Sequence, residues 1–222
     1  MWPRIERVLW VVSAVFFSIT ALLFAWSYVT TSRTSSGETV AAYPIVGTDA
    51  HTMGNIQAPI QLFVYMDLDC IYCKGFHTST LPKLLKAYGN DLFIIYREFP
   101  LASHPLAYEK AQAAECAYAQ GGNTAFFNFV DHMYAAMLSD GTYASPPVVS
   151  AAQASNLSLP EFQTCLDTGQ TKAVVNQNRL EGAIAGVGQV PSMIVRRGTT
   201  KVLITGNNFA QLETTIRYLL AK

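Results

Sequence analysis

Two apolar runs near the middle of the chain have the length and composition of buried strands. They cover residues 60–66 and 92–99, and each is continuous enough to lie inside a sheet. Between them, residues 70–88 place apolar side chains at helical spacing. Pro82 lies inside this segment and predicts a kink or a restart just before it, because proline removes a backbone donor. Together these segments predict a β-α-β unit.

The apolar spacing becomes helical over the following segment, from about residue 104 to residue 186. Gly121 and Gly122 predict a break between its first two helices, and Ser158 with Glu161 matches an N-terminal capping box. Proline positions and apolar periodicity predict five helices, over residues 105–119, 124–138, 147–154, 158–167 and 171–185.

The C-terminal part returns to strand patterns. Residues 192–196 and 201–205 predict a β-hairpin, and Asn208 with Gln211 predicts the cap of a final amphipathic helix. The complete order is βαβ, a helical segment, then ββα. This order predicts an α/β, thioredoxin-like fold with a helical insertion over about residues 104–186.

A longer apolar run, residues 8–30, lies near the N-terminus. It is long enough to cross the hydrocarbon core of a membrane, which takes about 20 apolar residues, and tryptophans lie near both of its ends. Arg4 and Arg7 precede it, so the positive-inside bias favours a cytoplasmic location for residues 1–7.

This pattern predicts a transmembrane signal-anchor, followed by a Ser/Thr/Gly-rich linker over residues 31–43 and a domain over residues 44–222. The domain would lie on the periplasmic or another extracytoplasmic side of the cell membrane. The alternative is a cleaved signal peptide. The anchor is favoured because the run exceeds a usual signal-peptide core and no A-x-A site follows it closely.

Charge and cysteine usage narrow the function. The chain carries 15 Lys and Arg against 15 Asp and Glu, without a basic stripe, so nothing indicates a nucleic-acid partner. All four cysteines follow the predicted anchor, and an even number in an oxidising compartment favours disulfides. No cofactor motif is present, and we expect neither a cofactor nor a metal.

Cys70 and Cys73 form a CxxC motif between a predicted strand and a predicted helix, which is the context of a thioredoxin-type redox site. Cys70 would lie at a helix N-terminus, where unpaired backbone N–H groups and the helix dipole stabilise a thiolate. The alternatives are a purely structural disulfide or half of a zinc site. Zinc would need two further ligands, whereas the other cysteines are isolated.

Cys116 and Cys165 both fall in the predicted helical insertion. A structural disulfide between them would close a loop of about 50 residues and add roughly 3–4 kcal/mol. The alternative is a pair of buried free thiols, which pack as small hydrophobic groups.

Several segments in order resemble the DsbA-like family of thiol:disulfide oxidoreductases, a branch of the thioredoxin superfamily. The resemblance runs from about His51 to the C-terminus. It rests on a lead-in ending at Ala58-Pro59, on D-x-x-C-x-x-C-K over residues 67–74, on residues 99–107 entering the insertion, and on Val190-Pro191 before a strand.

The resemblance implies roles for these residues. Cys70 would be the attacking and attacked sulfur, and Cys73 the buried resolving sulfur. Pro191 would follow a cis Val190–Pro191 bond beside the cysteines and offer backbone hydrogen bonds to an extended client; an ordinary trans proline is the alternative. The position before the proline is valine, as in oxidase-type members.

Residues next to the cysteines would adjust the chemistry. Ile71 and Tyr72 replace the Pro-His pair of strong oxidases, which leaves the oxidising strength open, and they would tune the redox poise and contribute an apolar contact surface. Asp67 or Asp69 could relay a proton to or from Cys73. Either aspartate could instead be a solvated loop residue or a helix cap.

The sequence and the resemblance therefore predict a membrane-anchored, monomeric oxidoreductase, an oxidase that introduces disulfides into unfolded or reduced exported proteins. A DsbB- or VKOR-type membrane protein would reoxidise it. Two alternatives stay open: a reductase or isomerase of the same fold supplied by an electron donor, and a redox-inactive, chaperone-like module that binds peptides.

Overall fold

The part of the chain that the structure describes comprises residues 18, 20, 51–143 and 146–222 of this computed structural model. Within these residues, no helix is both long enough and apolar enough to cross a membrane. The predicted anchor over residues 8–30 lies outside the described residues, apart from Ser18 and Thr20, and so does the predicted linker over residues 31–43. The elements below all belong to the unit Tyr43–Lys222.

A five-stranded mixed sheet forms the centre of this unit, with the strand order β1-β3-β2-β4-β5. Strands β2 and β3 are parallel, as the predicted β-α-β unit requires, whereas β4 runs antiparallel to β2 and forms a hairpin with β5. The strands are β1 (His51–Gly54), β2 (Ile60–Met66), β3 (Leu92–Glu98), β4 (Ser192–Arg197) and β5 (Thr200–Thr205).

The sequence analysis missed strand β1. It pairs antiparallel with β3, with His51 opposite Tyr96 and Gly54 opposite Phe93. Its four residues are too few to show an alternation of apolar and polar positions, and its pairing partner lies about 40 positions away along the chain. Gly54 has φ +88°, and a Cβ there would meet the Leu92 carbonyl oxygen at 2.5 Å.

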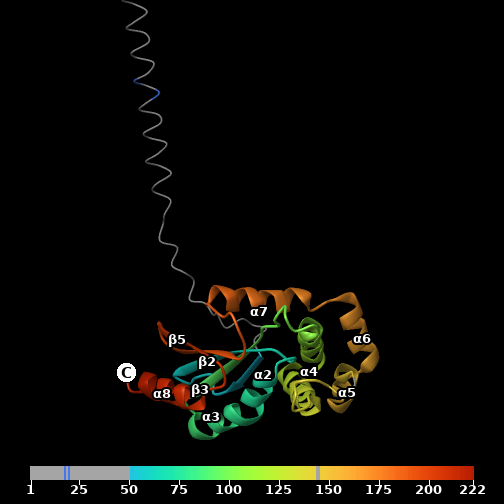
Figure 1. The fold of residues 1–222 in the computed structure, drawn as a ribbon, viewed down its shortest axis with the longest axis horizontal. Helices are drawn as coiled ribbons and strands as arrows, with labels where there is room; N and C mark the ends of the chain where they lie inside the picture. Colours follow the sequence, from blue (N-terminus) through green and yellow to red (C-terminus); the bar gives the residue numbers. More distant parts are fainter. Residues whose placement is uncertain (1–17, 19, 21–50, 144–145) are drawn as a thin grey trace, which may run out of the picture. The chain divides into compact units, whose positions relative to one another are not determined.

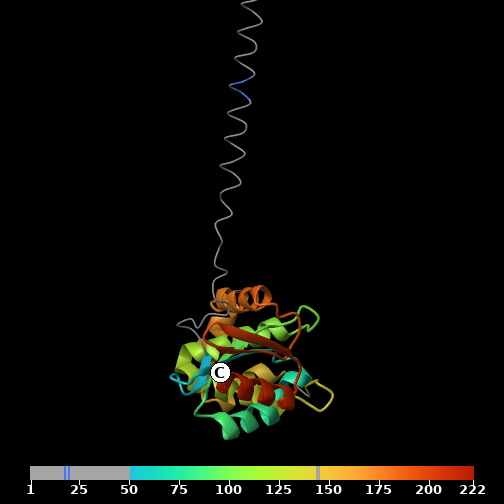
Figure 2. The same ribbon diagram turned by 90° about the vertical axis from the view of Figure 1, so that its left-hand side faces the viewer.

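Helices cover both faces of the sheet. Figures 1 and 2 show α3 (Leu81–Tyr88) and α8 (Phe209–Leu220) on one face and α7 (Lys172–Ile184) across the other. As predicted, the Asn208 side chain caps α8 by accepting a hydrogen bond from the Gln211 N–H at 3.1 Å. The buried residues of β2 and β3 fill the space between these layers.

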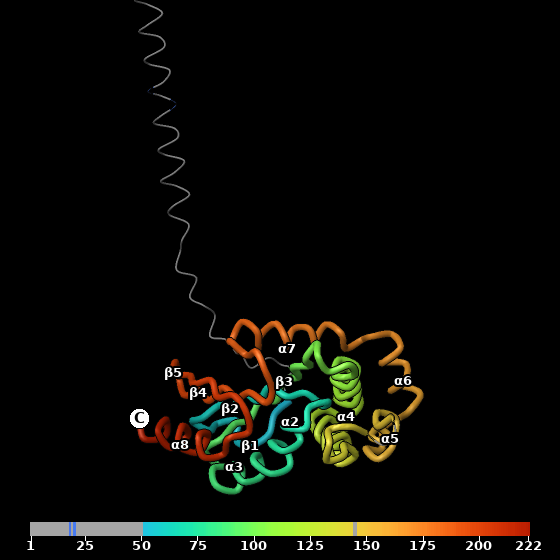
Figure 3. Tube along the Cα trace, viewed as in Figure 1, coloured from blue at the N-terminus to red at the C-terminus, as the bar shows by residue number. Residues whose placement is uncertain are grey.

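The path from β2 to β3 contains the predicted irregularity before Pro82. The chain passes through α2 (Ile71–Gly75), a π-helical turn over Phe76–Thr80, and α3 (Figure 3). Pro82 lies in the first turn of α3, where its missing N–H costs least. The π-helical turn precedes it directly, as expected where a helix must adjust its hydrogen bonds.

The helical insertion consists of α4 (Ala107–Ala136), α5 (Pro147–Ala154) and α6 (Leu159–Thr168), and continues into α7. Helix α4 is broken at Gly121 and Gly122, which have non-helical backbone angles, so it corresponds to the two predicted helices. A disulfide joins Cys116 in α4 to Cys165 in α6. Figure 1 shows α4, α5 and α6 grouped beside the sheet rather than on its faces.

The predicted capping box at the start of α6 does not form. Ser158 is the N-cap residue, but its side chain makes no capping hydrogen bond. Instead the Gln120 side chain accepts a hydrogen bond from the Ser158 N–H at 2.8 Å and donates one to the Ser158 carbonyl at 3.1 Å. A long-range amide contact has therefore taken the place of the local one.

Candidate active site

The first cysteine of the motif caps the helix that follows β2. Cys70 is the N-cap residue of α2 with extended backbone angles, φ −107° and ψ 118°, and its N–H donates to the Asp67 carbonyl at 3.1 Å. Its sulfur therefore faces the free N–H groups of the first helical turn, which is the arrangement that favours a thiolate. Both cysteines are free thiols and both are buried.

The two thiols have opposite acidities. A hydrogen bond from the Cys73 thiol, helped by the backbone N–H groups of Cys73 and Tyr72, lowers the pKa of Cys70 to about 6. Burial raises the pKa of the Cys73 thiol well above its usual value, and the nearby Cys70 sulfur raises it further. At neutral pH Cys70 is therefore mostly a thiolate, while Cys73 keeps its proton and donates it to that thiolate.

The loop that contains Val190 and Pro191 lies beside Cys70. The Val190–Pro191 peptide bond is cis, and Pro191 immediately precedes β4. The Cys70 thiol donates to the Val190 carbonyl oxygen at 3.8 Å, across 120 positions of sequence. The structure thus brings together the CxxC motif and the Val-Pro pair that the resemblance identified.

The residues between the cysteines differ in exposure. The Tyr72 side chain is 71% exposed, although the sulfurs on either side of it are buried. Ile71 is half-buried and lies against the loop at Gly141, where an added Cβ would come within 3.4 Å of it. Tyr72 therefore presents an aromatic surface to an approaching protein beside Cys70.

Asp67 lies in the loop before Cys70 and is almost fully buried, with 2% of its surface exposed. Its carboxylate accepts hydrogen bonds from the Asp69 N–H at 2.7 Å, the Leu101 N–H at 2.9 Å and His104 Nδ1 at 2.8 Å. Burial raises the pKa of Asp67, and these hydrogen bonds oppose that change. The side chain ties the loop before the motif to the segment that enters the insertion.

Asp69 has structural partners as well. Its carboxylate forms an ion pair with the buried Lys110 and accepts a hydrogen bond from the Leu106 N–H at 3.3 Å. Among the described residues, the hydrogen bonds of the Asp67 and Asp69 carboxylates go to backbone N–H groups, His104 and Lys110 rather than to a cysteine sulfur. A proton relay through either carboxylate therefore stays a prediction.

The sequence analysis did not assign three further side chains that hold this loop. The hydroxyl of Tyr134 donates to the Asp67 carbonyl at 3.2 Å, and the hydroxyl of Tyr143 donates to the Leu68 carbonyl. Lys110 Nζ lies 4.1 Å from the centre of the Tyr143 ring. All three belong to the insertion, and no local pattern links them to residues about 40 to 75 positions earlier.

A cavity of about 740 Å³ opens next to this loop, between the start of α4 and the segment that leads into α5. Its walls are mostly apolar, and its polar groups include Asp69, His104 and Lys110. A space of this size could accept one or two side chains of a bound peptide.

The acidity of Cys70 predicts a measurable titration. In the reduced protein, the ultraviolet absorbance of the thiolate should rise with a midpoint near pH 6, and the Cys70→Ser protein should lack this transition. Because the pKa of Cys70 is lowered from 9.0, the thiolate stabilises the reduced protein fully above pH 9. This contribution to stability is lost as the pH falls through about 6. An absorbance midpoint near pH 9 would contradict the lowered pKa of Cys70.

The family comparison covers most of the chain. Residues 47–216 match the family model described as thioredoxin. Among curated proteins, the Na⁺/H⁺ antiporter NhaA 1 of Mycolicibacterium vanbaalenii is 32% identical over 109 residues, which are 47% of this chain and 18% of that protein. The antiporter NhaA 1 of a Mycobacterium species, strain KMS, is 38% identical over 72 residues, or 32% of this chain and 12% of that protein. The chain thus matches less than a fifth of the length of these relatives.

Solved structures show the same fold. Oxidised BdbD from Bacillus subtilis superposes with a TM-score of 0.70 at 15% identity, covering 81% of this chain and 97% of that chain. DsbA2 from Pseudomonas aeruginosa gives a TM-score of 0.64 at 23% identity, covering 79% and 97%. For α-DsbA1 of Wolbachia pipientis the TM-score is 0.66 at 21% identity, covering 79% and 93%. Because the identities are low, these structures speak to the fold alone.

Proposed function

Because the chain belongs to the thioredoxin family and has the site of a thiol:disulfide oxidoreductase, we propose that it works as an oxidase that introduces disulfides into exported proteins. The observation that carries this proposal is the contrast between Cys70, with a pKa of about 6, and the buried, protonated Cys73. Cys70 can act as the nucleophile and the leaving group, and Cys73 can resolve the mixed disulfide.

The proposed exchange starts from the Cys70–Cys73 disulfide. A client thiolate attacks the Cys70 sulfur, the S–S bond breaks, and Cys73 leaves with the electron pair and takes up a proton. A second client thiolate then attacks the client sulfur of the mixed disulfide, and Cys70 leaves as a stabilised thiolate. The client has lost two electrons to the cysteine pair, which a partner disulfide must reoxidise.

The size of the acidity change supports oxidation as the direction of exchange. A fall of about three pKa units from 9.0 to about 6 stabilises the reduced form by about 4 kcal/mol. On the scale set by thioredoxin, at about −270 mV with a pKa of about 7, and DsbA, at about −120 mV with a pKa of about 3.5, this site would lie near −230 mV.

A potential near this value would be sufficient for the oxidation of typical clients. Structural disulfides of secreted proteins have potentials below about −300 mV, so electrons would flow from their dithiols to this site. The difference in potential of about 70 mV corresponds to roughly 3 kcal/mol. The site would be a milder oxidant than DsbA. That moderate value also keeps a reductase or isomerase role as the second candidate, since a strong electron donor could hold the pair reduced.

Client binding would use the surface around Cys70. The Val190 carbonyl lies beside the sulfur and can accept a hydrogen bond from an extended client backbone, while the exposed Tyr72 offers an apolar contact. The cavity beside Asp69 provides room for client side chains. Backbone recognition of this kind would suit many unfolded proteins and would not require a defined client sequence.

The membrane arrangement is part of the same proposal. Residues 8–30 would anchor the domain to the cell membrane, with its cysteines on the extracytoplasmic side. The anchor would hold the site near a DsbB- or VKOR-type reoxidising protein and so raise their effective concentration. The matched relatives are Na⁺/H⁺ antiporters by name, and a domain that works beside an ion antiporter would lie at a membrane.

Measurement of the reduction potential tests the direction. The full-length chain in detergent is equilibrated with glutathione buffers and alkylated, and the Cys70–Cys73 pair is quantified by mass spectrometry. We expect about −230 mV, by interpolation from the pKa of about 6. A value at or below about −270 mV would reject the oxidase, because the cysteine pair would then be as reducing as that of thioredoxin. The Cys116–Cys165 bond provides the internal control and should stay oxidised throughout.

A further inference from the structure

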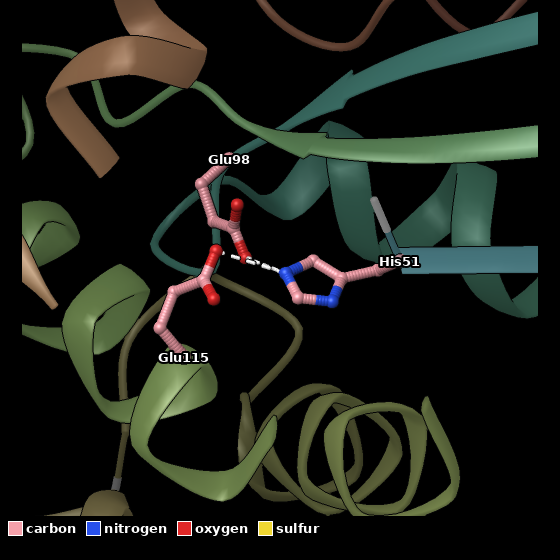
Figure 4. Close-up of side chains that lie close together, drawn as sticks. All are labelled: His51, Glu98 and Glu115. Carbon is pink, nitrogen blue, oxygen red and sulfur yellow. Dashed lines mark hydrogen bonds and ion pairs between the residues drawn. The ribbon is translucent and has the colours of Figure 1, made fainter. Parts of the chain in front are cut away.

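Three metal-ligating side chains meet in the interior, away from the cysteine pair. Figure 4 shows His51 from β1, Glu98 from the end of β3 and Glu115 from α4 pointing toward one another. Their exposed fractions are 0%, 2% and 4%. The His51 Nε2 atom lies 2.8 Å from Glu115 Oε1 and 3.6 Å from Glu98 Oε1, and the potential ligand atoms all lie within 4.8 Å of one another.

The surrounding residues hold these side chains in place. The His51 ring stacks on Phe126 with ring centres 3.7 Å apart, and the edge of Tyr118 packs against it at 4.5 Å. Asn178 in α7 donates to Glu98 Oε2 at 2.7 Å. These contacts orient the imidazole Nε2 and the second oxygen of Glu98 toward the centre of the cluster.

The Oε1 oxygen of Glu98 has no hydrogen-bond donor within the described ranges. It is fully buried and lies 3.6 Å from His51 Nε2, beyond hydrogen-bond distance. An ionised oxygen in such a place costs several kcal/mol unless a positive charge or a donor satisfies it. This oxygen marks the place where a cation would be accommodated.

The charges around the cluster leave it negative. Two buried carboxylates, those of Glu98 and Glu115, lie beside one imidazole, that of His51. Even a protonated imidazole would balance only one of their two negative charges, so a bound cation would be stabilised there.

We propose that His51, Glu98 and Glu115 bind one divalent transition-metal cation, as a structural site that is independent of the exchange reaction. An imidazole with two carboxylates suits Zn²⁺, Mn²⁺ or Co²⁺, whereas Ca²⁺ and Mg²⁺ prefer oxygen ligands alone and Cu⁺ prefers thiolates.

The spacing of the ligand atoms fits such an ion. Ligands about 2.1 Å from a tetrahedral metal lie roughly 3.4 Å from each other. The distance from His51 Nε2 to Glu98 Oε1 is already 3.6 Å, and the distance to Glu115 Oε1 would have to open from 2.8 Å by about half an ångström, within side-chain rotation. The fourth position would be left to a water molecule.

The site would join parts of the fold that are separate in sequence. His51 and Glu98 belong to the sheet, while Glu115 belongs to the insertion and directly precedes Cys116 of the disulfide. A metal ion would therefore fasten the edge strand β1 and the insertion to β3. The expected effect of the ion is on stability, since the hydrogen bond of His51 goes to Glu115 and that of the Cys70 sulfur goes to Val190.

The test is a Co²⁺ titration of the full-length chain, dialysed against chelator and with Cys70–Cys73 oxidised so that no thiolate competes. We expect one Co²⁺ per chain, a visible spectrum without a thiolate-to-cobalt band, and a Tm raised by about 5–10 °C at a hundredfold excess over Kd. His51→Gln and Glu115→Gln should each weaken binding at least about tenfold.

The matched control is His132→Gln, which removes an exposed histidine from the same helix as Glu115 and should bind Co²⁺ as the wild type does. Failure of the wild-type protein to bind one Co²⁺ would overturn the proposal, and so would equal binding by the wild type and the two ligand variants. If either ligand variant does not fold, the wild-type stoichiometry, spectrum and Tm shift still decide.

Discussion

Replacement of Cys70 by serine should abolish thiol–disulfide exchange, and replacement of Cys73 should instead trap its intermediate. With a pKa of about 6, Cys70 is mostly thiolate at pH 7, while burial raises the pKa of Cys73 well above its usual value and keeps that thiol protonated. The thiolate is the attacking species, so the Cys70→Ser protein should react at least about a hundredfold more slowly.

The Cys73→Ser protein keeps the attacking sulfur but loses the group that resolves the mixed disulfide. It should react with a model peptide disulfide and accumulate as a covalent adduct at Cys70, visible by mass spectrometry and released by dithiothreitol. The two variants serve as controls for each other, since both remove one buried thiol. Adducts on Cys73 in the Cys70→Ser protein would reverse the assigned roles, and equal activity of both variants with the wild type would favour the peptide-binding module.

Loss of the Cys116–Cys165 bond should produce the largest change in stability. The bond joins two helices across 49 positions, and cross-linking a loop of that length restricts the unfolded chain by about 3–4 kcal/mol. In a Cys70→Ser, Cys73→Ser background, Cys116→Ala with Cys165→Ala should lower the free energy of unfolding by this amount and the Tm by roughly 10 °C. Urea unfolding followed by circular dichroism measures it.

Reduction provides the matched control for that experiment. Dithiothreitol should destabilise the background protein as much as the two alanine substitutions do, and should have no further effect once both alanines are present. Both cysteines are buried, so a reduced protein also has to accommodate two separated sulfurs in its interior, where the Thr171 hydroxyl lies 3.9 Å from the Cys116 sulfur. A loss below about 1 kcal/mol would show that the insertion holds together without its disulfide.

Local sequence signals predicted the elements of the fold well where burial and turn chemistry agree. The strand at residues 60–66 is a continuous apolar run and was predicted with its observed bounds. Asn208 caps its helix because a short polar side chain reaches the N–H three residues on. Ser158 stands in the same kind of context, yet Gln120 from another helix bonds its backbone instead.

The residues of the candidate site also differ in how far local sequence predicts them. Cys70 and Cys73 are recognisable because their chemistry depends on four consecutive residues and the helix that follows. The contact between Cys70 and Val190 became predictable only through the family resemblance, since it spans 120 positions. The bond from His104 to Asp67 and the meeting of His51 with Glu115 depend on how the insertion packs on the sheet, which no local pattern encodes.

The hydrogen bond from Cys70 to the Val190 carbonyl has a consequence for the pH at which clients are held. The carbonyl oxygen is occupied only while the Cys70 sulfur carries a hydrogen. In the oxidised enzyme that sulfur has none, and the oxygen is open to the N–H of an incoming client. After exchange Cys70 is mostly a thiolate at neutral pH, so the oxygen stays open. Only below a pH of about 6 does protonation of the reduced protein occupy this acceptor again, so the reduced protein should hold an extended client less tightly in acid.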